Sequence, residues 1–229
     1  PSANQNNLNR PNGILHEGDR FGYDYDIHIQ RVATWVQGVF RFNKFDFFAA
    51  GEVSGTRFFR EGNVKNGLFP NNSFGVSKVN KFQNQSVKAG VTYKFNGRNY
   101  IYANGAYMTR APFFENAYIS PRTRDVQQDN LVNETIKSVE GGYIMNAPSL
   151  KVRLSGYYTT FEDGLNVLSF YHDEYRNLVN YALSNIDKVH YGGEFGFEAK
   201  VAPGLTMNGA AAVKVRVSGI EWRCEQYFE

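Results

Sequence analysis

The sequence has few of the residues that form disulfides, metal sites and redox centres. Its 229 residues include one cysteine, Cys224, so no disulfide can form within the chain. Four histidines, His16, His28, His172 and His190, are scattered without the short spacing that metal ligands need. The sequence therefore predicts no metal and no cofactor, and nothing indicates redox chemistry.

Long apolar runs and blocks of like charge are also missing. No run approaches the ~18 consecutive apolar residues of a membrane-spanning helix, and the mean hydropathy of −0.47 would by itself favour a soluble protein. The first residues are polar and contain no signal peptide, so we expect a mature or internal piece, or a protein that stays in the cytoplasm. The net charge of +3 comes from 25 basic and 22 acidic residues spread along the chain, which gives no support for nucleic-acid binding.

Aromatic residues and glycine are abundant, with 19 Phe, 15 Tyr and 22 Gly. This composition is typical of strands and their turns. The stretch from Asn130 to Asp163 shows the pattern best, because Val152, Leu154 and their neighbours alternate with polar residues such as Arg153. A period of two indicates a β-hairpin with one apolar and one polar face, reversing at residues 146–149.

Similar alternation recurs along the chain and predicts eight extended segments. They cover residues 21–42, 45–60, 77–95, 100–110, 134–146, 150–163, 188–200 and 205–217. Short reversals at 43–44, 96–98, 146–149 and 202–204 alternate with long loops at 61–76, 111–133 and 164–186. In the second reversal, Asn96-Gly97 is expected to take positive φ at both positions of a tight turn. Residues 1–20 are expected to form a loop or disordered lead-in, residues 21–218 the strands and loops, and residues 219–229 an atypical tail.

The sorting of connections into short and long ones predicts an outer-membrane β-barrel, in which short turns lie on one side and long loops on the other. Strands of about 10 residues or more suit a tilted crossing of a bilayer, and half-polar strands explain the low hydropathy. Aromatic residues near the short turns favour a girdle at the membrane interface. The alternation predicts that Val152, Leu154, Val189, Phe195, Met207 and Ala211 face lipid, and that Glu140, Arg153, Glu194 and Asn208 face the lumen.

The order of several motifs resembles the late barrel region of TonB-dependent outer-membrane receptors. These motifs are Asn130-Leu131 with Glu134, then Glu140-Gly-Gly-Tyr143, then a strand ending in Tyr157-Tyr158 and Glu162-Asp163. The resemblance extends back to Phe48-Ala-Ala-Gly51 and forward to Gly204-Leu-Thr206, and covers roughly residues 21 to 213.

The resemblance implies an all-β fold, with about eight consecutive strands forming part of a larger, twenty-two-stranded antiparallel transmembrane barrel. The resemblance also implies that the protein is not an enzyme. It implies instead the energised uptake of a scarce nutrient such as a metal chelate, vitamin, glycan or peptide. The partners implied are outer-membrane lipid, the TonB complex through a plug region absent from this sequence, and a surface lipoprotein. The polar segment 220–229 lacks the closing strand with a terminal aromatic that such barrels have, so we expect a fragment or truncated product.

If the chain is part of a receptor, its substrate meets the long loops first. The candidate contacts are therefore basic and aromatic residues at or near these loops, with solvated loop residues as the alternative interpretation: Arg60, Arg110, Arg122, Arg124, Tyr171 and Tyr175.

Other functions remain open from the sequence. The strands could close by themselves as a small outer-membrane barrel that acts as an adhesin or structural protein. A hydrolase at the barrel rim could use Ser169 and His172. A soluble β-sandwich that binds carbohydrate is a third alternative.

Overall fold

The computed structural model describes residues 7–174, 176–219 and 223–228. These residues form one antiparallel sheet of ten strands and a helical turn. The strands are β1 (Tyr25–Phe42), β2 (Phe45–Gly62), β3 (Gly75–Val76), β4 (Asn80–Lys94), β5 (Asn99–Arg110), β6 (Glu134–Asn146), β7 (Leu150–His172), β8 (Asn177–Ala202), β9 (Leu205–Gly219) and β10 (Arg223–Phe228). The helical turn, α1, covers Phe114–Ala117. Each of the eight predicted segments corresponds to one long strand, and the all-β prediction is confirmed.

The sheet has an apolar face and a polar face, which the strand register defines. Residues that are directly opposed on neighbouring strands share a face, and Tyr143, Leu154, Phe195 and Ala211 lie in one such row. The next row joins Gly142, Ser155, Glu194 and Ala212 on the other side of the sheet. The register confirms that the six residues predicted to face lipid share the apolar face, and that Glu140, Arg153, Glu194 and Asn208 share the polar face.

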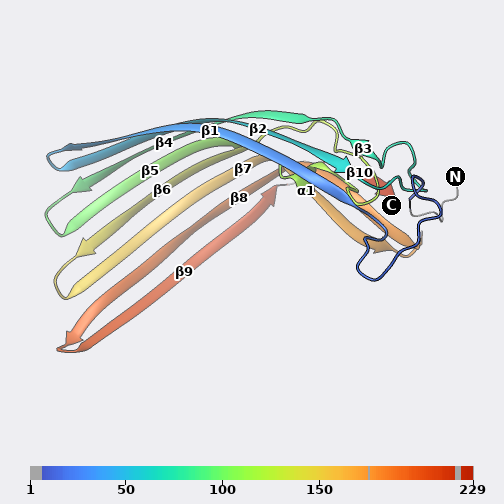
Figure 1. Cartoon of the computed structure of the whole chain (residues 1–229). Coiled ribbons are helices and arrows are strands. Elements are labelled where there is room, and N and C mark those ends of the chain that lie inside the picture. The colour runs from blue at the N-terminus through green and yellow to red at the C-terminus, as the bar shows by residue number, and fades with distance from the viewer. Residues whose placement is uncertain (1–6, 175, 220–222, 229) are drawn as a thin grey trace.

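Short reversals gather at one end of the sheet, which we call the turn end (Figure 1). The reversal between β8 and β9 contains Pro203 and then Gly204, whose φ is +82°. This order and conformation suit a type II turn. The prediction for Asn96-Gly97 was wrong, because neither residue has positive φ. Residues 95–98 form a wider turn instead, in which the Asn96 side-chain oxygen accepts hydrogen bonds from the backbone N–H groups of Arg98 and Asn99, both at 2.9 Å.

The opposite end of the sheet, the loop end, departs from the prediction in one connection. Residues 164–186 were expected to form a long loop, but β7 continues to His172 and β8 starts at Asn177. Two register shifts beside Gly164 interrupt the pairing of the two arms. Pairing then continues regularly from Asn166 opposite Leu183 to His172 opposite Asn177, so the hairpin extends past its neighbours. Strand β10 pairs with the extended part of β8, from Arg223 opposite Ser184 to Phe228 opposite Val179.

The sheet is arched and remains open. Within the described residues β1 pairs with β2 alone, whereas β9 and β10 pair with β8 alone, so each outer strand has an unpaired edge. Figure 1 shows the arch, with β1 along one edge and β9 along the other. The fold is therefore an arc of antiparallel strands that fits part of a larger barrel. No helix among the described residues is long and apolar enough to cross a membrane.

Candidate ligand-binding pocket on the polar face

The loop of residues 111–133 folds back over the polar face at the loop end. Its helical turn places Phe114 and Tyr118 against Phe58 of β2, with ring centroids 6.2 and 6.3 Å from that of Phe58. Phe58, Phe114, Ala117 and Tyr118 are buried together and form an apolar cluster. Burial of a large side chain stabilises by about 1.5–3 kcal/mol, so this cluster holds the loop on the sheet.

Buried polar contacts fix the loop further. Arg60 of β2 is only 2% exposed. Its Nε donates to the Pro121 carbonyl at 2.7 Å, and its Nη1 donates to the Ser73 carbonyl at 3.0 Å. From the β7–β8 extension, Asn180 Nδ2 donates to Ser120 Oγ at 2.9 Å. Arg60 thus joins the loop that follows β2 to the loop of residues 111–133. The extended hairpin of β7 and β8 supports residues 111–133 through the bond between Asn180 and Ser120.

Burial also changes the titration of two groups in this loop. It raises the pKa of the Asp125 carboxyl, and a hydrogen bond from Gln127 and the charge of Arg60 offset part of this effect. Burial likewise raises the pKa of the Tyr118 phenol, although its hydrogen bond with Ser77, at 2.7 Å, acts in the opposite direction. Both shifts follow from the removal of charge-stabilising water where the loop packs on the sheet.

A pocket lies where this loop covers the polar face of β1, β2, β4 and β5. Its volume is about 380 Å³, within the usual range for small-molecule sites. We call it the loop-roofed pocket. Residues 111–114, which include Phe113 and Phe114, form the roof, and the side walls include the apolar residues Ile29, Phe58 and Met108. The floor consists of short polar side chains, among them Ser54, Thr56 and Asn84.

Three basic side chains line the loop-roofed pocket. Arg31 forms an ion pair with Glu52 and also donates to Ser54 Oγ at 3.4 Å. Arg110 Nε donates to Glu134 Oε2 at 3.1 Å, and its guanidinium lies 4.5 Å from the centre of the Phe113 ring. Lys88 is exposed and forms no ion pair within the described residues. The pocket therefore contains one cation that no carboxylate balances.

Asn84 on the floor has an unused hydrogen-bonding group. The residue is 9% exposed. Its Nδ2 donates weakly to Thr56 Oγ1 at 3.4 Å, whereas its buried Oδ1 has no hydrogen-bond partner among the described residues. Buried polar side-chain atoms are almost always paired. Asn84 can therefore accept a hydrogen bond from a ligand.

A second polar network lies nearer the middle of the sheet. Tyr102 donates to Glu140 Oε1 at 2.6 Å, and Arg153 Nη2 donates to the Tyr102 oxygen at 3.3 Å. Arg153 also lies 3.8 Å from Glu140. This network satisfies its own polar groups across β5, β6 and β7, so we interpret it as structural.

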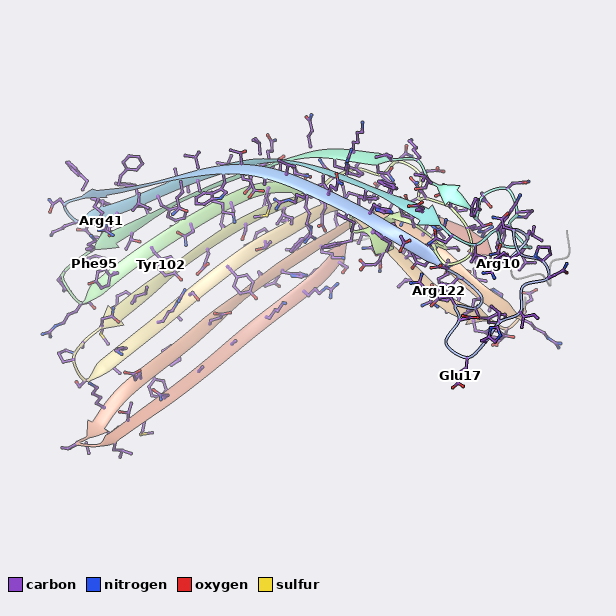
Figure 2. The ribbon with its side chains drawn as sticks, in the orientation of Figure 1. Arg10, Glu17, Arg41, Phe95, Tyr102 and Arg122 are labelled. Carbon is purple, nitrogen blue, oxygen red and sulfur yellow. The ribbon has the colours of Figure 1, made fainter. Side chains whose placement is uncertain are left out.

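Five of the six candidate contacts lie in the described residues, and the structure does not bring these five together. Arg110 lines the loop-roofed pocket, but Arg60 is buried as an anchor of the loop. Arg122 is exposed and lies 5.3 Å from the Tyr23 ring centre, at the loop end (Figure 2), and Arg124 lies 4.4 Å from the ring centre of Phe69. Tyr171 is exposed on the β7 extension, and Tyr175 lies outside the described residues.

Sequence reasoning did not select Arg31, Asn84 or Lys88 as ligand contacts. Alternation places Asn84 and Lys88 on the polar face, where they resemble many other polar residues of the strands, whereas Arg31 falls on the same side of its strand as Ile27 and Ile29. What distinguishes them is the roof of residues 111–114, which comes from a different part of the chain.

The proposed hydrolase residues are not assembled into a catalytic pair. Ser169 donates to Asn180 Oδ1. Ser169 and His172 are three positions apart in a regularly paired part of β7, so their side chains point to opposite faces.

Comparisons with known proteins give a family and one solved structure. Residues 1–223 match the family described as TonB dependent receptor-like, beta-barrel. No curated protein matches the chain. A solved structure described as "Copper transporter OprC" aligns with 13% sequence identity and a TM-score of 0.46, over 87% of this chain and 40% of that protein.

Proposed function

Because the chain belongs to the TonB-dependent receptor-like β-barrel family, we propose that it forms an arc of the outer-membrane barrel of a receptor. This receptor takes up a scarce nutrient, such as a metal chelate, vitamin, glycan or peptide, with energy supplied through TonB. The family is a class of outer-membrane transporters rather than of enzymes.

The observation that carries the proposal is the separation of an apolar face from a polar face across strands β2 to β9. On the apolar face, exposed side chains include Val87, Val139, Leu154, Phe195 and Val213, from five different strands. A soluble protein rarely exposes such a wide apolar surface, whereas lipid covers it in a barrel.

Aromatic residues of the same face lie close to the short turns. Phe45 contacts Phe47 and Tyr93, with ring centroids 5.8 and 4.9 Å apart, and Tyr93 contacts Phe95 at 4.8 Å. Figure 2 shows Phe95 at the turn end. Aromatic girdles at the membrane interface are typical of outer-membrane barrels, so this cluster supports the same orientation, with the turn end periplasmic.

The open edges support a barrel completed by further strands. The chain spans 40% of the solved protein that it matches. In the proposed receptor, outer-membrane lipid contacts the apolar face, a plug region contacts the TonB complex, and a surface lipoprotein is an additional partner.

Cysteine labelling in the full-length receptor tests the orientation of the two faces. Single cysteines replace Leu154 or Phe195 on the apolar face, and Arg153 or Glu194 on the polar face. A membrane-confined thiol reagent should label the first pair alone. Equal labelling of both pairs would exclude a membrane barrel.

Growth under nutrient limitation tests transport. Strains that lack the receptor or TonB should share a growth defect on one nutrient, and replacement of residues 111–133 in the full-length receptor should weaken its uptake. A receptor-dependent nutrient whose uptake does not need TonB would contradict the proposal.

A further inference from the structure

We propose that the loop-roofed pocket binds a small amphipathic ligand, or the end of a larger one, that carries one negative charge, an apolar body and an N–H or O–H donor. The proposal deepens the proposed function, on which it rests for the role of the ligand as a transported nutrient. Binding to the pocket can be measured without transport.

We infer the apolar part of the ligand from the apolar side chains of the roof and walls of the pocket. Phe113 in the roof is 52% exposed although it lies beside a sheet, and it faces the pocket together with Met108 and Ile29. The guanidinium of Arg110 stacks over the Phe113 ring, and both residues line the pocket. A flat, apolar group between these side chains would lose water from both of its surfaces, and binding is favoured in proportion to the apolar area that is buried.

We infer the hydrogen-bond donor of the ligand from the unpaired side-chain oxygen of Asn84. An unpaired buried acceptor is unfavourable, and Thr56 Oγ1 contacts the other end of the amide, Nδ2, at 3.4 Å. If the amide were turned around, its N–H group would be the unpaired one, and a ligand hydroxyl could pair with it as well. A hydroxyl group therefore suits this position in either orientation.

The single negative charge follows from the balance of charges. Glu52 neutralises Arg31 and Glu134 neutralises Arg110, whereas Lys88 forms no ion pair within the described residues. Lys88 and Asn84 lie on the same face of β4, four residues apart. Their Cα atoms are thus about 13 Å apart, and a ligand of one ring with a short acidic arm can reach both side chains.

The test uses the purified full-length receptor in detergent, with para-hydroxycinnamate as the probe. Two relatives of the probe each lack one feature: para-hydroxycinnamamide has no charge, and cinnamate has no hydroxyl. Isothermal titration calorimetry at neutral pH should give sub-millimolar binding of para-hydroxycinnamate. Each relative should bind about tenfold more weakly, as expected for the loss of one charge-assisted or buried hydrogen bond.

Variants of the receptor test which residue recognises the charge of the probe and which recognises its hydroxyl group. Lys88→Gln should remove the preference for the acid over the amide, and Asn84→Ala should remove the preference for para-hydroxycinnamate over cinnamate. Lys94→Gln is the matched control, because Lys94 is a polar-face lysine of β4 that pairs with Asp46 at 2.6 Å and lies outside the pocket. Lys88 is exposed, so its variant should fold even if Asn84→Ala does not.

The outcomes separate this proposal from the proposed function. Equal binding of acid and amide, unchanged binding to Lys88→Gln, or no binding of para-hydroxycinnamate would overturn the assignment of the pocket. None of these results depends on TonB, whereas the growth test depends on TonB and uses no probe. Either proposal can therefore fail while the other stands.

Discussion

At the scale of single residues, Gly142 leaves room for the ring of Tyr102, whose hydroxyl forms hydrogen bonds with Glu140 and Arg153 on the polar face. Tyr102 and Gly142 are directly opposed on β5 and β6. A Cβ on Gly142 would lie 2.7 Å from the Tyr102 ring and 2.6 Å from the Leu154 carbonyl oxygen. The absence of a side chain at this position lets Tyr102 lie across β6 and donate to Glu140.

We predict that Gly142→Ala destabilises the full-length receptor by about 1–3 kcal/mol, the usual cost of overpacking. Gly105→Ala is the control, because its Cβ would meet nothing closer than the Ser138 carbonyl oxygen at 3.9 Å. Thermal melting in detergent, followed by the loss of heat-modifiable migration on a gel, measures the difference. Equal melting temperatures for the two variants would contradict the role of Gly142.

Asp125 should make the stability of its loop depend on pH. Burial raises the pKa of its carboxyl above the ordinary value for an aspartate. The stabilisation from the protonated acid is therefore complete below the unfolded pKa and is lost as the pH rises through the folded pKa. Amide hydrogen exchange in residues 111–133, corrected for intrinsic rates, should show more frequent opening as the pH rises across this window. Asp125→Asn should abolish this dependence, and Asp129→Asn, at an exposed position of the same loop, should retain it.

At the scale of elements, the loop 111–133 owes its position to side chains far away in the sequence. Arg60 and Pro121 are 61 residues apart, and Ser120 and Asn180 are 60 residues apart. No local pattern predicts such contacts, because loop closure between distant residues depends on the complete fold. The sequence predicted the loop and its length but not its inward fold.

Arg60 and Arg122 provide a matched test of that arrangement. Arg60→Met leaves the carbonyls of Ser73, which is buried, and Pro121, which is half-buried, without their donor, at a cost of about 1–3 kcal/mol for the buried group. We expect limited proteolysis to cut residues 111–133 at least tenfold faster in this variant. Arg122→Ala removes an exposed side chain and should not change the cleavage rate. Similar rates in both variants would show that Arg60 does not hold the loop.

The strands were predictable for a simple physical reason. Alternation sets which side of a strand each residue occupies, so residues such as Leu154 and Arg153 could be assigned to opposite faces before any partner was known. The same rule failed at residues 164–186, because two register shifts around Gly164 interrupt the alternation before regular pairing resumes from Asn166 to His172. The loop-roofed pocket could not be predicted, because its roof, walls and floor come from four separate segments of the chain.

At the scale of the whole molecule, the unpaired edges of β1 and β9 determine what the sheet can do alone. Each unpaired backbone group costs several kcal/mol in hydrocarbon, and an open edge invites pairing with another chain. The sheet must therefore find further strands, close on itself or aggregate. Closure alone would be crowded, because an eight-stranded barrel is just wide enough for packed side chains, whereas the polar face carries Lys88, Arg153, Glu194, Glu198 and Arg216.

We therefore predict that the 229-residue chain, expressed alone and refolded in detergent, gives aggregates or an ill-defined oligomer. Size-exclusion chromatography with light scattering measures its mass, and heat modifiability on a gel reports whether a closed barrel has formed. The proposed full-length receptor, refolded in the same detergent, is the control and should be monodisperse, since further strands would pair with both edges. A monodisperse, heat-modifiable monomer of the chain alone would contradict the arc and favour the self-closed barrel, the structure that an adhesin or a structural outer-membrane protein would have.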